Sequence, residues 1–346
     1  PVPVMQEMPD TAARVNRLFV RGNWLVEADT IAPQPPGTYD KTGREFAPNR
    51  LGLAEWLVDS GNPLTGRVLV NRIWTELFGW GIVETVEDFG IQGAEPTHPE
   101  LLDWLAVNFT EDQQWKLKSL LRTIVTSDTY RQDSRIDSTA LEIDPNNRWL
   151  ARGPRFRLSA EQLRDQALAV SGLLNPDVYG PSVMPHQPEG VWNVIRHLAR
   201  WQTSSDGQNH RRGLYTFFRR ASPYPTLILF DAPPRELCVS RRIRTNTPLQ
   251  AMVTLNDSVF VEAAGALAAR VAADAPTQAE TQIANAFEYA TAHPPDSFSQ
   301  SRLMELYDLN LADYRAIDTL RVPPERMALE TVCRAILNLD EVLVKR

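Results

Sequence analysis

Helix-start signals recur along this chain, and they constrain its fold more than any other feature. Each contains a helix-capping residue such as Asn, Ser or Thr, and all but the first add a proline in the first turn or Glu or Gln three residues later. They stand at Asn49, Asn62-Pro63, Thr97 with Glu100, Ser159 with Gln162, and Thr247-Pro248. Apolar residues spaced three and four apart follow them. The pattern predicts helices through most of 49–172 and again after 247.

The expected β content is small. Short strands are predicted around the turn at Gly22-Asn23, within a proline-rich N-terminal β segment over 1–48. The apolar runs LYTFF and TLILF predict a β-hairpin near 214–230. We therefore expect a mainly α fold with a small β component (α+β), built as a multi-helix globular domain.

The periodicity also predicts how the chain divides. Residues 1–48 form the β segment and pack on a main helical domain over 49–272. Hydrophobic periodicity is weak over 273–300, which predicts a linker. Residues 301–346 are expected to form helices that pack on the main domain.

Composition narrows the functional classes. The 346 residues carry a net charge of −7, which argues against a general nucleic-acid binder. No apolar run reaches the roughly 18 residues that a membrane-spanning helix needs. No signal peptide is apparent, but the chain starts at Pro1 and not at Met, so this leaves the compartment open.

The two cysteines, Cys238 and Cys333, form no CxxC or CxxCH motif. This excludes a zinc ribbon and a covalently attached haem within the chain. A disulfide between the two stays open at this point.

Eight arginines fall between 211 and 244 of this acidic chain. Guanidinium groups bind carboxylate, sulfate or phosphate through paired hydrogen bonds. If the predicted hairpin forms, the arginines on its two sides converge on one anion-binding patch. The expected ligand-binding residues are Arg219, Arg220, Arg235, Arg241 and Arg242. The alternative is that these arginines pair with Asp231, Glu236 and other acids and hold loops together.

Two tryptophans extend the hypothesis towards glycans. Trp192 and Trp201 lie in an irregular loop over 173–210, beside Arg196 and Arg200. Flat aromatic rings next to arginine suit an acidic sugar. The alternative is that both rings pin the loop to the core.

Catalytic candidates are less specific. Asp231 and Glu236 follow an expected strand, and His98 or His210 offers an acid–base partner. The alternative for His98 is a structural network with nearby polar side chains. His186, Glu189, His197 and His210 match no zinc-binding spacing, so no metal ligand is assigned.

Several phrases of the chain occur in the order of a known family. They read NPLTGRVLVNRIW from 62, THPELLDWLA from 97, RRGLYTFFRRASPYP from 211, FDAPPRELC from 230 and TNTPLQAM from 245. Together with shorter segments they resemble the planctomycete PSD1 family, a domain of unknown function (DUF1553), over nearly the whole chain. Gly66, Ser127-Asp128 and Phe218 depart from its usual residues.

The resemblance implies an exported, extracytoplasmic protein, of which this chain is a C-terminal portion. In such proteins the domain follows a partner domain and often a cytochrome c-like module. No cofactor is expected in this chain, since any haem would sit in that neighbouring module. The family has no accepted catalytic residues, so none is carried over.

We therefore expect a non-catalytic binding or assembly module. Its partners would be the N-terminal modules of the same protein and an anionic polysaccharide. One alternative is a polysaccharide hydrolase that uses carboxylates and histidine. Another is a docking scaffold for a cytochrome c module.

Overall fold

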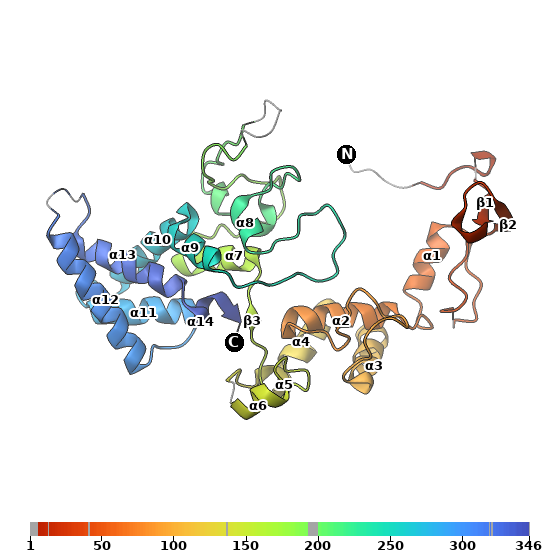
Figure 1. Cartoon of the computed structure of the whole chain (residues 1–346), viewed down its shortest axis with the longest axis horizontal. Coiled ribbons are helices and arrows are strands. Elements are labelled where there is room, and N and C mark those ends of the chain that lie inside the picture. The colour runs from red at the N-terminus through yellow and green to blue at the C-terminus, as the bar shows by residue number, and fades with distance from the viewer. Residues whose placement is uncertain are drawn as a thin grey trace. The chain divides into compact units, whose positions relative to one another are not determined.

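The computed structural model describes residues 6–12, 14–40, 42–135, 138–192, 200–317, 319 and 321–345 (Figure 1). Over these residues the chain is mainly helical, with two small antiparallel sheets, which confirms the predicted fold class. It divides into two compact units, Pro1–Gly153 and Pro154–Arg346. This division differs from the predicted boundaries, and each unit is described separately below.

Unit 1 begins with the expected β segment. Strands β1 (Asn16–Phe19) and β2 (Glu27–Ile31) pair antiparallel around the short helix η2 (Val20–Gly22), and η1 (Asp10–Ala12) precedes them. Gly22 adopts a φ of 74°, a left-handed conformation that glycine reaches without strain.

Helices make up the rest of unit 1. They are α1 (Arg50–Leu57), α2 (Thr65–Phe78), α3 (Pro99–Val107), the π-helical turn η3 (Asn108–Asp112), α4 (Leu117–Val125), α5 (Asp128–Arg131) and α6 (Ser138–Ile143). The Asn49 side chain accepts a hydrogen bond from the Gly52 amide and caps α1, as its sequence signal predicted. The apolar faces of α2, α3 and α4 enclose a core that includes Trp74, Phe78, Leu105, Phe109 and Leu120.

One predicted cap is wrong. Thr97 and Glu100 do not form a capping box, because α3 begins after His98, which has no side-chain cap. The Thr97 hydroxyl instead donates to the Ile82 carbonyl oxygen at 3.3 Å. The nearby Asn71 amide is fully buried and bonds both backbone groups of Val83. These contacts tie the segment after α2 to the start of α3.

Unit 2 contains most of the long helices. Its elements are β3 (Phe156–Arg157), α7 (Ala160–Ser171), η4 (Gln208–His210), η5 (Gly213–Tyr215), α8 (Pro225–Leu229), α9 (Pro248–Asn256), α10 (Ser258–Asp274), α11 (Ala279–Thr291), α12 (Ser297–Arg315), α13 (Pro324–Leu337), α14 (Asp340–Leu343) and β4 (Val344–Lys345). The predicted capping box of Ser159 and Gln162 opens α7, and Thr247 with Gln250 opens α9 in the same way.

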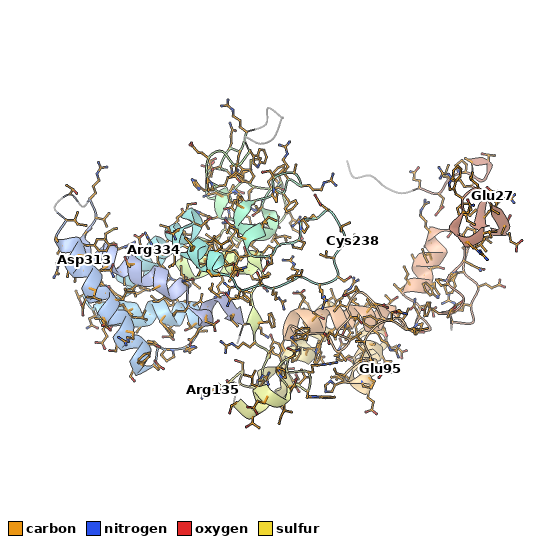
Figure 2. All side chains as sticks on the ribbon, viewed as in Figure 1. Glu27, Glu95, Arg135, Cys238, Asp313 and Arg334 are labelled. Carbon is orange, nitrogen blue, oxygen red and sulfur yellow. The ribbon has the colours of Figure 1, made fainter. Side chains whose placement is uncertain are left out.

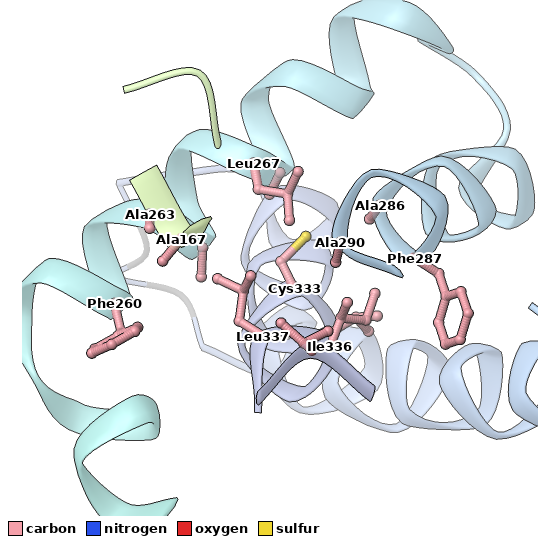
Figure 3. Close-up of a cluster of buried hydrophobic side chains, with 14 of the residues drawn as sticks. Ala167, Phe260, Ala263, Leu267, Ala286, Phe287, Ala290, Cys333, Ile336 and Leu337 are labelled. Carbon is pink, nitrogen blue, oxygen red and sulfur yellow. The ribbon is translucent and has the colours of Figure 1, made fainter. Parts of the chain in front are cut away.

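Small side chains let the helices of unit 2 approach closely. Ala263 on α10, Ala286 on α11 and Cys333 on α13 are all fully buried (Figure 3). Leu267 and Ile336 fill the space between them. Removing such a buried leucine costs about 3–5 kcal/mol in comparable cores, so we expect substitutions in this cluster to destabilise unit 2 strongly.

The expected linker over 273–300 instead contains α11. Ile283, Ala286, Phe287 and Ala290 recur at helical spacing on α11 and are buried in the core of unit 2. Two of these four residues are alanines, whose small side chains give a weak hydrophobic signal in the sequence, and the linker prediction is therefore wrong.

The predicted β-hairpin at 214–230 is also wrong. Residues 213–215 form the short helix η5, and Pro225 opens α8, where its fixed φ suits the first helical turn. Thr216 does adopt an extended conformation, but its bridge partner is Val183. The second sheet of the chain is the β3–β4 pair, in which Phe156 lies opposite Lys345 and Arg157 opposite Val344.

The cysteines are not paired. Cys238 is exposed on the long segment between α8 and α9 (Figure 2), whereas Cys333 is buried. Burial raises the pKa of the Cys333 thiol to about 12. No helix within the described ranges has the length and hydrophobicity to cross a membrane.

Candidate anion-binding site

A pocket in unit 2 gathers part of the arginine cluster. It lies where the link from β3 to α7, the end of α8 and the segment 242–250 meet. Its space is about 280 Å³, open solvent included. The charged groups in its lining are three guanidiniums and one carboxylate: Arg157, Arg242, Arg244 and Asp231.

Asp231 joins the two ends of the segment 232–244, which carries four of the eight arginines. It has a φ of 62°, a left-handed conformation that Asp tolerates better than most residues. Its carboxylate accepts from the Thr245 amide and hydroxyl, each at 2.8 Å, and from the Gln250 side-chain amide at 3.4 Å. The Gln250 amide also donates to the Leu229 carbonyl oxygen. Residues 232–244 therefore leave and rejoin the core at one fixed point.

Arg242 is held against the start of α7. Its Nη1 atom lies 2.5 Å from the Glu161 carboxylate, in the first turn of that helix. A carboxylate there also interacts favourably with the helix dipole. The Arg242 charge is thus partly neutralised by its partner.

Arg244 and Lys345 share one aromatic ring. The Arg244 guanidinium lies 4.3 Å from the Phe156 centroid, and the Lys345 ammonium lies 5.7 Å from it. Phe156 and Lys345 face each other across the β3–β4 pair. Desolvation lowers the pKa of Lys345 to about 8, so its ammonium is charged at neutral pH but is poorly hydrated.

Arg157 is the third guanidinium of the pocket. Its Nη1 donates to the Asn246 side chain at 2.8 Å, and its guanidinium lies 5.8 Å from the Phe230 ring. Its buried Nε meets no acceptor among the described residues. Desolvation lowers the pKa of Arg157, and the charges of Asp340 and Asp231 oppose that shift.

The other four arginines that were predicted to bind a ligand do not line this pocket. Arg219 covers the Trp192 ring at 4.9 Å, and Arg235 covers the Phe218 ring at 4.7 Å. Arg220 and Arg241 are exposed. Of the five expected ligand-binding arginines, the pocket lining contains only Arg242. Because the predicted hairpin does not form, no strand pairing there brings Arg219 and Arg220 alongside Arg241 and Arg242.

Trp192 and Trp201 are packed inside unit 2. Trp192 exposes 8% of its surface, and its ring lies 5.2 Å from that of Trp201. Trp201 stacks on Tyr224, and its indole N–H donates to the Pro185 carbonyl oxygen at 2.7 Å. This matches the alternative in which the two rings pin the loop to the core. Arg196 and His197 lie outside the described residues.

The catalytic candidates are dispersed. Asp231 is engaged by Thr245 and Gln250, while Glu236 is exposed on the arginine segment. His210 bonds the Glu262 carboxylate at 2.9 Å. His98 belongs to unit 1, where its Nδ1 lies 2.9 Å from the Thr97 hydroxyl oxygen.

A buried polar network near His210 was not anticipated. Arg164 exposes 3% of its surface and donates to the Asn209 carbonyl oxygen. Nearby, the Tyr224 hydroxyl donates to the His186 carbonyl oxygen at 2.7 Å, and burial raises the pKa of Tyr224 to about 12. Arg164 thus ties Asn209 to α7, and the neutral Tyr224 hydroxyl ties His186 to the start of α8.

Metal-ligating side chains do not gather within the described ranges. No group of three His, Cys, Asp or Glu residues is placed there to hold an ion. The His186 ring instead bonds the Ser258 hydroxyl at 2.7 Å.

The sequence did not single out Arg157, which lines the pocket, or Lys345, which lies against the same Phe156 ring as Arg244. Arg157 follows an aromatic residue just before the α7 capping box, and Lys345 ends the apolar run VLV. An alternating run of this kind is a weak strand signal. Only the pairing of β3 with β4, nearly 190 residues apart in the chain, brings the two segments together.

Comparison with known families matches residues 49–307 to PSD1, described as a protein of unknown function (DUF1553). The chain belongs to this family. The PSD1 match starts at the Asn49 cap and includes Arg157, Asp231, Arg242 and Arg244. Lys345 lies beyond the matched PSD1 residues. No curated protein and no solved structure matches the chain.

Proposed function

We propose that this PSD1 chain is a binding module that recognises an anionic group, such as a sulfate or carboxylate of a polysaccharide, in the pocket of unit 2. The observation that carries the proposal is the set of three guanidiniums around one recess in a chain of net charge −7. The unpartnered Nε of Arg157 adds a donor that an anion would satisfy.

The environment of the pocket favours an anion over water. Phe156 and Phe230 lie against its basic side chains and limit their hydration. A charge-assisted hydrogen bond in such surroundings is stronger than one in open solvent. The Asp231 carboxylate opposes a bound anion, but its oxygens already accept hydrogen bonds from Thr245 and Gln250.

The wider setting is part of the same proposal. The sequence resemblance supports an extracytoplasmic, planctomycete-type protein in which N-terminal modules adjoin this chain. A docking scaffold for a cytochrome c module stays an alternative within that setting. A polysaccharide hydrolase is a further alternative, but the engagement of Asp231 by Thr245 and Gln250 gives it less support.

Calorimetric titration of the chain with a heparin-derived octasaccharide and with oligogalacturonate tests the proposal. We expect saturable binding that Arg157→Ala and Arg244→Ala each weaken by about tenfold or more, since each removes a charge-assisted contact of about 1.5–3 kcal/mol.

Arg219→Ala is the matched control, because its guanidinium rests on Trp192 and does not line the pocket. Absence of binding by the wild-type chain, or equal losses in Arg219→Ala and Arg244→Ala, would contradict the proposal.

A further inference from the structure

Unit 1 contains a second pocket, whose chemistry differs from that of the arginine pocket. It lies between the end of α2, the Thr97-His98 pair and the turn at 147–150. Its space is about 370 Å³ when open solvent is included. Trp74, Phe78 and Trp80 supply aromatic walls, and Trp80 leaves 42% of its surface exposed.

The turn that borders this pocket is rigid and strained. Asn147 and Leu150 both have positive φ values, 52° and 57°, which side chains with a Cβ rarely adopt. The buried Asp144 carboxylate fixes the turn by accepting from the Arg148 and Trp149 amides, each at 2.8 Å. The buried Arg152 donates to the Asp144 carbonyl oxygen at 2.8 Å. Conformations of this kind cluster at binding sites, where the surroundings hold them in place.

The polar groups in the lining suit hydroxyl groups. Oε2 of Glu84 lies 3.8 Å from Nη1 of Arg148, which is too far for a direct hydrogen bond. A hydroxyl between them can donate to the carboxylate and accept from the guanidinium. His98 adds an acceptor. The Thr97 hydroxyl donates to Ile82, so it can accept from Nδ1–H of His98, which leaves Nε2 with its lone pair.

The charges of Glu84 and Arg148 cancel, so this pocket favours an uncharged ligand. Aromatic walls with a rim of hydroxyl-binding groups match a sugar ring, which has apolar faces and a polar edge. We propose that the pocket of unit 1 binds a neutral pyranose unit of a glycan, with Trp80 as the stacking wall and Glu84, His98 and Arg148 as hydrogen-bonding partners. This site does not depend on the arginine pocket.

The test is to titrate the whole chain separately with cellohexaose, xylohexaose and maltohexaose in 500 mM salt. Tryptophan fluorescence and calorimetry monitor the binding. High salt suppresses binding that depends on exposed charges. We expect saturable binding of at least one oligosaccharide. Trp80→Ala should weaken it by about tenfold through loss of the stacking wall, and Glu84→Gln should weaken it by a smaller factor.

Trp24→Ala is the matched control, because Trp24 is 71% exposed and does not line the pocket. The proposal fails if none of the three oligosaccharides binds, if Trp80→Ala binds like the wild type, or if Trp24→Ala weakens binding equally. Because the probes are uncharged, a failure here leaves the arginine pocket untouched, and the converse also holds.

Discussion

The two candidate binding pockets differ in how their charges are arranged. The pocket of unit 2 concentrates guanidinium groups around a recess whose rim is a long segment tied at Asp231. The pocket of unit 1 balances one carboxylate against one guanidinium and is bordered by a short turn fixed through Asp144 and Arg152. Under our two proposals, the first arrangement selects ligands by charge and the second by shape and hydroxyl pattern. Ligand binding at the two pockets should therefore respond differently to salt, pH and substitution.

The largest separation is expected from Asp231→Ala. The substitution removes the acceptor for Thr245 and leaves the buried Gln250 amide with one partner fewer. We expect unit 2 to lose about 2–3 kcal/mol of unfolding free energy and the chain to lose most of its anion affinity. Unfolding in urea, monitored by circular dichroism, measures the loss of stability. Titration with the heparin-derived octasaccharide measures the loss of anion affinity.

Asp231→Asn is the control for this change. Asparagine tolerates the left-handed backbone and keeps one acceptor oxygen, so a smaller loss is expected. Binding of neutral oligosaccharide to unit 1 should be the same in both variants. A loss of that binding would show that the two pockets are not independent.

Salt should produce the next largest difference. Raising sodium chloride from 50 to 500 mM shortens the distance over which charges act to a few ångströms. We expect octasaccharide affinity to fall by about tenfold or more and cellohexaose affinity to change by less than about twofold. Titrations at four salt concentrations give both slopes, and parallel slopes would remove the distinction.

The smallest effect concerns pH and Lys345. Its pKa is lowered to about 8, so anion affinity should decline as pH rises from 7 to 9.5 and the ammonium loses its proton. Stability of the unliganded chain should rise over about pH 8 to 10.5, because the unfolded state then binds more protons than the folded state. Lys345→Met should flatten both trends. A pH-dependent decline that persists in this variant would assign it to another group.

Local signals were the reliable part of the sequence. The Asn49 cap and the Ser159–Gln162 capping box depend on residues within one turn, and both form as predicted. The Thr97 signal failed because its hydroxyl is used by Ile82, fifteen residues earlier. The hairpin prediction failed because Thr216 found its partner in Val183, within the irregular loop.

In the candidate site, too, local sequence patterns predicted some residues and missed others. Arg242 was anticipated because it belongs to a dense local cluster, whereas Arg157 stands alone in the sequence, and Lys345 comes close to Arg244 only through the pairing of β3 with β4. Arg219 belongs to the same cluster, yet it packs on Trp192, because the backbone between it and Arg242 forms the short helix α8 and a long irregular segment and not a hairpin. Composition located the arginines, but only tertiary structure decides which of them face the same space.

The β3–β4 pair also has a consequence for how the protein is made. Residues 156 and 157 leave the ribosome early, but their partners at 344 and 345 emerge only after nearly 190 further residues. At the usual rate of about 5–20 residues per second, β3 waits on the order of ten seconds or more for its neighbour. The β3–β4 pair therefore cannot form during most of the synthesis of unit 2, even though unit 1 has already been synthesised in full.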